Sequence, residues 1–145
     1  METLGNLKIL IVDDEPANLK VLYNILKAYS LRLFMLQDST IVLSTIQKEI
    51  PDLILLDVMM PEIDGYELCK KIKENKQYEH IPIIFISALN DTSDIVRGFE
   101  IGGVDYIVKP FRNEEVICRI KTHLTIQKQK KELWKLNENK DRFFS

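Results

Sequence analysis

The sequence predicts an α/β domain in which five parallel strands and five helices alternate to form one doubly wound sheet. Five short, almost continuously apolar runs recur along the first 108 residues, and amphipathic stretches separate them. Runs of this length and apolar content are typical of parallel strands that are covered on both faces. Regular alternation of strand and helix favours a sheet with helices on both sides.

Each element has its own local signal. The apolar runs predict strands at Lys8–Val12, Arg32–Leu36, Leu53–Leu56, Ile83–Ile86 and Val104–Val108. Apolar residues at helical spacing mark the buried faces of the intervening helices, which are, in chain order, Leu19, Leu22, Leu26 and Tyr29; Val42, Ile46 and Ile50; Leu68 and Ile72; Ile95, Val96 and Phe99; and Val116, Ile117, Ile120 and Leu124. Asp64 with Glu67 three residues later predicts a helix N-cap, and Gly102-Gly103 predicts a left-handed C-cap.

Length and charge limit the classes of function. A chain of 145 residues with 46% hydrophobic and 29% charged residues fits one globular domain. Residues 121–145 carry seven Lys or Arg and three Asp or Glu, whereas the preceding body is acidic. An acidic body argues against nucleic-acid binding by the domain, and the mixed charges of the tail indicate a solvated helix face.

The cysteines and the apolar segments indicate a cytoplasmic protein. Cys69 and Cys118 lie far apart within helical patterns, which is typical of small buried hydrophobes in a reduced compartment. Neither the cysteines nor the two histidines have metal-ligand spacing. The chain has no signal peptide pattern and no apolar stretch near the ~20 residues of a membrane span, so we expect no membrane contact by this chain.

Several functional side chains stand just past the predicted strand ends, namely Asp13, Asp14, Asp57, Ser87 and Lys109. Each has an ordinary alternative on its own. The acidic pair before Glu15-Pro16 could simply cap the first helix, and Lys109-Pro110 could be a surface turn. Because the carboxyl ends of parallel strands form the ligand crevice of such a sheet, we expect all five to converge at one edge.

The predicted cluster fits phosphoryl transfer. Three carboxylates at one edge repel one another unless a cation lies among them, and Mg²⁺ is the natural oxygen-bound candidate. A carboxylate can act as a nucleophile and form an acyl phosphate. Such transfer needs charge neutralisation and in-line placement, which a cation, Lys109 and the Ser87 hydroxyl would supply.

Four segments resemble the signatures of bacterial response-regulator receiver domains, the phosphoacceptor modules of two-component systems. They are Ile11-Val12-Asp13-Asp14-Glu15, the stretch from Asp57 to Gly65, Ile86-Ser87-Ala88, and the stretch from Asp105 to Phe111. The resemblance covers about residues 7–124. It implies a flavodoxin-like (βα)5 fold with strand order 2-1-3-4-5, here with an extended C-terminal helix.

The resemblance also implies a site and a reaction. Asp57 corresponds to the phosphoacceptor, which takes a phosphoryl group from phosphohistidine. Asp13, Asp14, Asp57 and the Met59 backbone carbonyl correspond to the Mg²⁺ ligands. The implied partners are a histidine kinase or a histidine phosphotransfer protein, and a downstream effector or kinase domain. Transfer would be catalysed by the domain's own side chains, and no independent turnover is expected.

The remaining positions that match the family pattern imply a switch. Ser87 corresponds to the hydroxyl that follows the phosphoryl group, and Tyr106 to the aromatic side chain that turns inward with it. Their movement would change a surface of the last two helices and the intervening strand. Lys109 would bind a phosphoryl oxygen, and the Lys109-Pro110 bond is expected to be cis. Met59 and Leu89 are apolar and cannot orient an attacking water, which predicts slow self-dephosphorylation.

The tail is predicted to be a separate helical unit. We place the receiver at residues 1–125 and a helical linker, or coiled-coil tail, at 126–145. A heptad spacing fits Ile126, Gln129, Leu133, Leu136, Lys140 and Phe143. The segment from Leu136 to Ser145 resembles the lead-in to a histidine-kinase dimerisation helix, which implies an N-terminal receiver of a hybrid kinase and possible homodimers. An ordinary charged helical tail is the alternative.

Three rival functions remain open to comparison. A phosphorylation-independent interaction or dimerisation module is the main alternative. An aspartyl-nucleophile phosphatase would need a second Asp two residues after Asp57, where Met59 stands. A nucleotide or flavin binder is poorly supported, because the sequence has no glycine-rich phosphate motif and the sheet edge is acidic.

Overall fold

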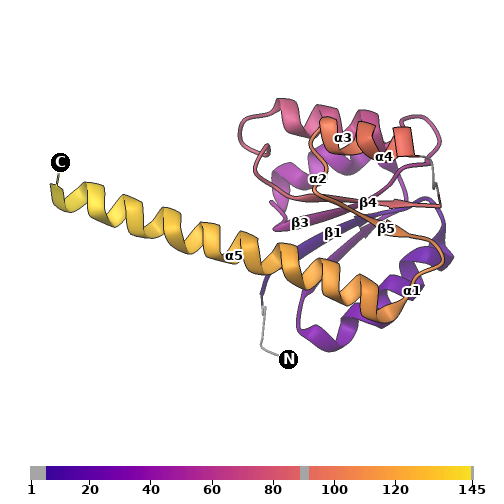
Figure 1. The fold of residues 1–145 in the computed structure, drawn as a ribbon, viewed down its shortest axis with the longest axis horizontal. Helices are drawn as coiled ribbons and strands as arrows, with labels where there is room; N and C mark the ends of the chain where they lie inside the picture. Colours follow the sequence, from indigo (N-terminus) through magenta and orange to yellow (C-terminus); the bar gives the residue numbers. More distant parts are fainter. Residues whose placement is uncertain (1–5, 89–91, 145) are drawn as a thin grey trace.

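The computed structural model describes residues 6–88 and 92–144, and the side chains of 92–93 and 138–144 lie outside that description. Its five strands form one parallel sheet in the order β2-β1-β3-β4-β5, as expected (Figure 1). The strands are β1 Lys8–Val12, β2 Arg32–Leu36, β3 Leu53–Asp57, β4 Ile83–Ser87 and β5 Asp105–Val108.

Helices cover both faces of the sheet (Figure 1). They are α1 Pro16–Leu26, α2 Val42–Lys48, α3 Gly65–Glu74, α4 Thr92–Glu100 and α5 Asn113–Phe144. Short 3-10 turns, η1 Lys27–Tyr29 and η2 Ser39–Ile41, extend α1 and precede α2. α1 and α5 lie on one face, and α2, α3 and α4 lie on the other, which confirms the doubly wound arrangement.

Two apolar cores follow from the alternation of side chains along each strand. Ile9, Ile11 and Leu55 point toward α1 and α5, whereas Leu10 and Leu56 point toward α2, α3 and α4. All five are essentially inaccessible to solvent. A strand with both side-chain sets buried must be apolar at nearly every position, and this explains the continuous runs in the sequence.

Several predicted boundaries need correction. β3 and β4 each run one residue further than predicted, so Asp57 and Ser87 are the last residues of their strands, because Asp57 still pairs in register with Ile86. Ile50 lies beyond the end of α2 and is exposed, since that helix stops at Lys48. Val96 and Phe99 were expected to face the core, but both are about half exposed on α4.

The predicted caps are present. The Asp64 carboxylate accepts a hydrogen bond from the Glu67 backbone N–H at 2.8 Å, which satisfies one of the free N–H groups of α3. Gly102 follows α4 with φ of 114°, a conformation that strains any residue with a Cβ atom. The Lys109-Pro110 peptide bond is cis, as expected.

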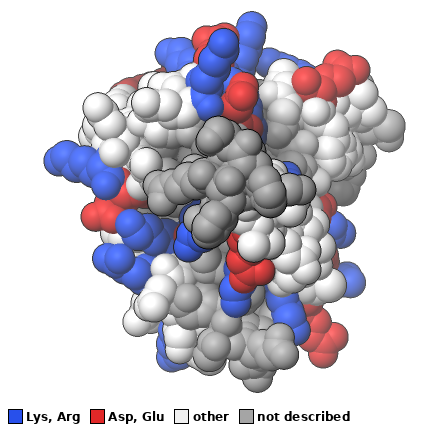
Figure 2. Space-filling model, turned by 90° about the vertical axis from the view of Figure 1, so that its left-hand side faces the viewer, with Lys and Arg blue, Asp and Glu red and all other residues white. Residues whose placement is uncertain are grey.

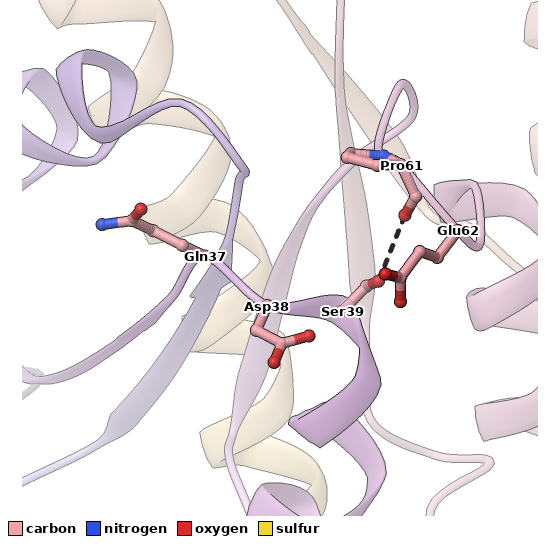
Figure 3. Close-up of a pocket in the computed structure, with 5 residues that line it drawn as sticks. All are labelled: Gln37, Asp38, Ser39, Pro61 and Glu62. Carbon is pink, nitrogen blue, oxygen red and sulfur yellow. Dashed lines mark hydrogen bonds between the residues drawn. The ribbon is translucent and has the colours of Figure 1, made fainter.

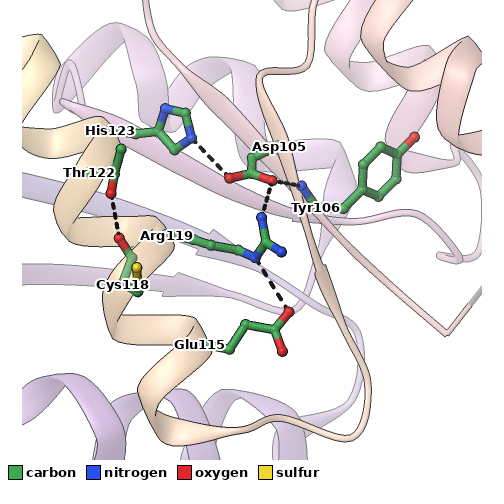
Figure 4. Close-up of polar contacts among 7 residues, drawn as sticks. All are labelled: Asp105, Tyr106, Glu115, Cys118, Arg119, Thr122 and His123. Carbon is green, nitrogen blue, oxygen red and sulfur yellow. Dashed lines mark hydrogen bonds and ion pairs between the residues drawn. The ribbon is translucent and has the colours of Figure 1, made fainter.

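Ion pairs hold α5 against β5 (Figure 4). The Asp105 carboxylate lies 2.6 Å from Arg119 Nη1 and 3.0 Å from His123 Nε2, and it also accepts a hydrogen bond from the Tyr106 backbone N–H. Arg119 makes a second ion pair with Glu115, one turn earlier on α5. The aspartate that begins β5 therefore fixes the first half of α5 on the sheet.

α5 continues well past the sheet as a single helix (Figure 1). It runs without a break from Asn113 to Phe144, so most of the segment predicted as a helical tail continues the last helix of the domain. In the part of the chain that the structure describes, no helix combines the length and the apolar content that a bilayer span requires.

Candidate functional site

Three carboxylates meet at the carboxyl ends of β1 and β3. These strands are direct neighbours, with Val12 paired to Leu56, so the residues that follow them are brought together. Carboxylate oxygens of Asp13, Asp14 and Asp57 all lie within 4.8 Å of one another. Asp13 and Asp57 are buried, Asp57 to 2% exposure, and Asp14 is half-buried. The predicted convergence of the three acids is present in the structure.

Asp13 is held in place by its own loop and by the start of α1. One of its carboxylate oxygens accepts a hydrogen bond from the Glu15 backbone N–H at 2.9 Å, and the other accepts one from Asn18 Nδ2 at 3.1 Å. Glu15 is the N-cap of α1 and makes no capping bond with its side chain, while Pro16 is the first helical residue. Asn18 was not predicted as part of the site, although an amide in the first helical turn after an acidic pair is a recognisable signal in the sequence.

Lys109 supplies the positive charge that faces the acids. Its Nζ atom lies 3.4 Å from Asp57 Oδ1 and 3.7 Å from Asp13 Oδ2. Its backbone N–H donates to the carbonyl of Ser87 at 3.0 Å, which joins the loop after β5 to the end of β4. The Met59 backbone N–H donates to Asp57 Oδ1 at 3.3 Å.

The pKa of Asp57 shows the electrostatic cost of this arrangement. Burial and, next, the neighbouring Asp13 carboxylate raise the pKa of Asp57 to about 7, although Lys109 and the Met59 N–H act in the opposite direction. One lysine therefore does not neutralise the cluster. A hard divalent cation with oxygen ligands would complete the neutralisation, and the donor set fits Mg²⁺.

Ser87 and Tyr106 lie on neighbouring strands, Ser87 at the end of β4 and Tyr106 within β5. Ser87 is buried. The Tyr106 ring points inward beneath α4, where its hydroxyl donates to the Asp94 carbonyl at 2.9 Å and lies 3.0 Å from the Tyr66 hydroxyl. The Tyr106 ring also packs against Phe85 at a centroid distance of 5.4 Å. Tyr66 was not identified from the sequence, because nothing local links α3 to β5.

Two glycines permit the close packing around these groups. A Cβ atom on Gly65 would clash with the Asp57 backbone carbonyl, so α3 approaches the end of β3 as closely as it does only because residue 65 is glycine. A Cβ atom on Gly98 would clash with the Tyr106 hydroxyl. Small residues thus set the positions of both the acid and the aromatic side chain.

Met59 and Leu89 are the two apolar residues that the sequence analysis placed near an attacking water. Met59 is 68% exposed and lies in the loop after β3. Leu89 lies outside the described residues.

A hollow of about 290 Å³ lies between the loops after β2 and β3, lined by Gln37, Asp38, Ser39, Pro61 and Glu62 (Figure 3). The Ser39 hydroxyl donates to the Pro61 carbonyl across it, at 3.5 Å, and joins the two loops.

Comparison with known proteins identifies the class. The family model of the response regulator receiver domain matches residues 9–121, which include all seven of the predicted site residues. The chain therefore belongs to the response regulator receiver domain family, as the sequence analysis expected. Members of this family take part in two-component signalling, bind Mg²⁺ at an acidic pocket, and interact with histidine kinases and effector domains.

Individual relatives support the same assignment. A probable cyclic di-GMP phosphodiesterase of Vibrio cholerae is 39% identical over 139 residues, which are 96% of this chain and 31% of that protein. The receiver domain of a signal transduction histidine kinase from Syntrophus aciditrophicus is 34% identical, with a TM-score of 0.74 over 81% of this chain and 89% of that one. A two-component response regulator from Clostridium difficile is 28% identical, with a TM-score of 0.76 over 83% and 97%. The chain spans less than half the length of the first curated relatives.

The raised pKa of Asp57 predicts a characteristic pH dependence. Because this pKa rises from 3.8 to about 7 on folding, the folded state holds a proton that the unfolded state has lost, and stability falls as pH rises through that window. Without divalent cations at pH 8, Asp57→Asn is therefore expected to raise the free energy of unfolding by about 1–3 kcal/mol, with little change at pH 4.

Urea denaturation at the two pH values, with and without Mg²⁺, measures this effect. Added Mg²⁺ should stabilise the wild type at pH 8 more than it stabilises the variant. Asp38→Asn, at an exposed aspartate outside the cluster, is the matched control and should show no gain at pH 8. A variant no more stable than the wild type at pH 8 would contradict the electrostatic account of the cluster.

Proposed function

We propose that Asp57 of this domain accepts a phosphoryl group from a phosphohistidine of a partner protein, with Mg²⁺ bound at the acidic pocket. The observation that carries the proposal is the placement of Asp57, a buried carboxylate within 4.8 Å of Asp13 and Asp14 and 3.4 Å from Lys109. An isolated buried acid would be protonated and a poor nucleophile, whereas an acid among these groups becomes ionised when a cation binds.

The transfer is a displacement at phosphorus. A carboxylate oxygen of Asp57 attacks, the new O–P bond gives an acyl phosphate, and the N–P bond of the phosphohistidine breaks. The imidazole leaves with the bonding electron pair, and it leaves as a neutral ring when its other nitrogen carries a proton in the phosphohistidine. Lys109 approaches Asp57 closely enough to bind a phosphoryl oxygen as a point charge.

The acidic residues have the role of metal ligands in this proposal. Asp14, Asp57 and the Met59 carbonyl would hold the ion directly, and Asp13 would contribute a carboxylate that is already oriented by Glu15 and Asn18. Bound Mg²⁺ would neutralise the charge that builds up on the phosphoryl oxygens.

We propose that phosphorylation is signalled onward by a population shift between two conformations of the α4–β5–α5 surface. The Ser87 hydroxyl would donate a hydrogen bond to the phosphoryl group, and Tyr106 would report its position. The inward Tyr106 ring supports this role, because its hydroxyl bonds the Asp94 carbonyl of α4 and its backbone N–H bonds Asp105, which holds α5. Both elements are thus tied to one residue of β5.

Residues 126–145 are proposed to be a signalling helix that leads to an effector domain, with a histidine kinase as the effector that the sequence favours. The continuous helix α5 supports the first part. Three apolar residues of the heptad, Ile126, Leu133 and Leu136, are exposed on it, which supports pairing with a second copy of the chain.

Phosphorylation is tested by intact-mass spectrometry after incubation with acetyl phosphate, with and without Mg²⁺. We expect a single added phosphoryl group in the wild type only when Mg²⁺ is present, and none in Asp57→Asn. Asp38→Asn should be modified as the wild type is. Absence of the adduct from folded wild-type protein would favour the phosphorylation-independent interaction module instead.

The lifetime of the adduct tests the apolar character of Met59. Because a methionine cannot orient an attacking water, Met59→Asn is expected to speed loss of the phosphoryl group at least about fivefold, since an amide can position that water. Met59→Leu keeps the apolar surface and should leave the rate unchanged. Equal decay of both variants would remove Met59 from the account of slow hydrolysis.

Pairing through the tail is tested by sedimentation equilibrium over a range of protein concentrations. Leu133→Ala is expected to weaken self-association at least about tenfold, because the leucine is a heptad position and its contact area would be lost. Lys135→Ala, which is exposed on the same helix but outside the heptad, is the control. A wild type that stays monomeric at the highest concentration would contradict pairing.

A further inference from the structure

The second half of α5 is attached to the body at the end of the sheet opposite the acidic pocket. α5 runs from the pocket end toward the start of the strands and leaves the body there (Figure 1). Figure 2 views that end, where Lys and Arg side chains are scattered over the visible surface with Asp and Glu among them. The side chains of α5 that face the body here determine how the helix leaves it.

A buried aspartate makes the central attachment. Asp52 lies just before β3 and is 4% exposed. One oxygen of its carboxylate accepts a hydrogen bond from the Lys8 backbone N–H at 2.8 Å, and the other pairs with Lys131 Nζ of α5. A buried carboxylate is costly unless it is both hydrogen-bonded and paired, so Lys131 stabilises a group that the body would otherwise bury at a cost.

Two further contacts lie on the same face of the helix. Gln127 is 2% exposed, one turn before Lys131, and follows the fully buried Leu124. Trp134, one turn later, packs edge-on against His80, with ring centroids 5.4 Å apart. The spacing of these residues, i, i+3, i+7 and i+10, is that of one helix stripe, so the attachment spans about three turns.

The opposite stripe of α5 is exposed. Ile126 and Leu133 lie two residues after Leu124 and Lys131, roughly 200° around the helix at 100° per residue. Both are exposed. The contacts with the body lie on the first stripe, where Lys131 and Trp134 also keep part of their surface exposed. The rotation of the helix on the body therefore decides the direction in which the outer stripe, Ile126 and Leu133, faces.

We propose that Asp52, Lys131, His80 and Trp134 form a latch that fixes the rotation of the outgoing helix on the body. The latch makes the tail a rigid arm instead of a flexible tether. A displacement of α5 at the pocket end is then carried to the outer stripe as a movement of the whole helix. This inference goes beyond phosphoryl acceptance, because it concerns contacts at the far end of the sheet and holds with or without it.

Trp134 provides the test, since it is the only tryptophan in the sequence. Its time-resolved fluorescence anisotropy in the full chain reports whether the tail moves with the body. In the wild type we expect the decay to follow the tumbling of the whole protein. Lys131→Gln and Asp52→Asn should each add a fast component, and hydrogen exchange of amides 128–134 should rise about tenfold. Asp52→Asn keeps an oxygen that can accept from the Lys8 N–H.

Lys130→Gln removes the same charge from a neighbouring exposed position and is the control. A double variant, Asp52→Asn with Lys131→Gln, should behave as either single variant does, because both break one pair. This non-additivity also distinguishes the latch from pairing between chains, because pairing would slow the motion of Trp134 independently of the Asp52–Lys131 pair. A fast component in the wild type, additive effects of the two changes, or an effect of Lys130→Gln as large as that of Lys131→Gln would each overturn the proposal.

Discussion

The crowding of three carboxylates at one edge of a parallel sheet is the constraint on which the rest of this structure depends. Parallel neighbours β1 and β3 end at the same edge, so Asp13 and Asp14 after β1 are brought close to Asp57 at the end of β3. Their repulsion is offset only in part by Lys109. The segment after β1, the end of β3 and Lys109 after β5 therefore share one electrostatic balance.

The aromatic cluster beneath α4 links β5 to the helices on both faces of the sheet. Tyr106 joins Tyr66 of α3 and the Asp94 carbonyl of α4, while its backbone N–H meets the aspartate that holds α5. Gly98 leaves just enough room for the Tyr106 hydroxyl. An inward ring in so tight a site has few intermediate positions, which suits a switch between two states.

α5 connects the two ends of the molecule. At the start of β5 it is held by Asp105, and further along the helix by Asp52, so α5 contacts the strand that carries Tyr106 and the residue just before the strand that ends in Asp57. Each attachment is an aspartate on the body paired with a basic side chain on the helix. Because a helix transmits rotation and translation along its length, these two attachments define how movement in the body reaches the tail.

The sequence alone determined the strand runs, the sheet order through its family resemblance, the caps at Asp64 and Gly102, and the edge on which Asp57 would lie. These features depend on local periodicity and on strand direction, which neighbouring residues specify. Only the tertiary structure decided that β3 extends through Asp57, that Val96 and Phe99 stay about half exposed, and that Asn18 reaches Asp13. The pair Asp52 and Lys131, 79 residues apart, is likewise invisible in the sequence. Such contacts depend on how each helix is rotated against the sheet, and that rotation is set by packing of the whole core.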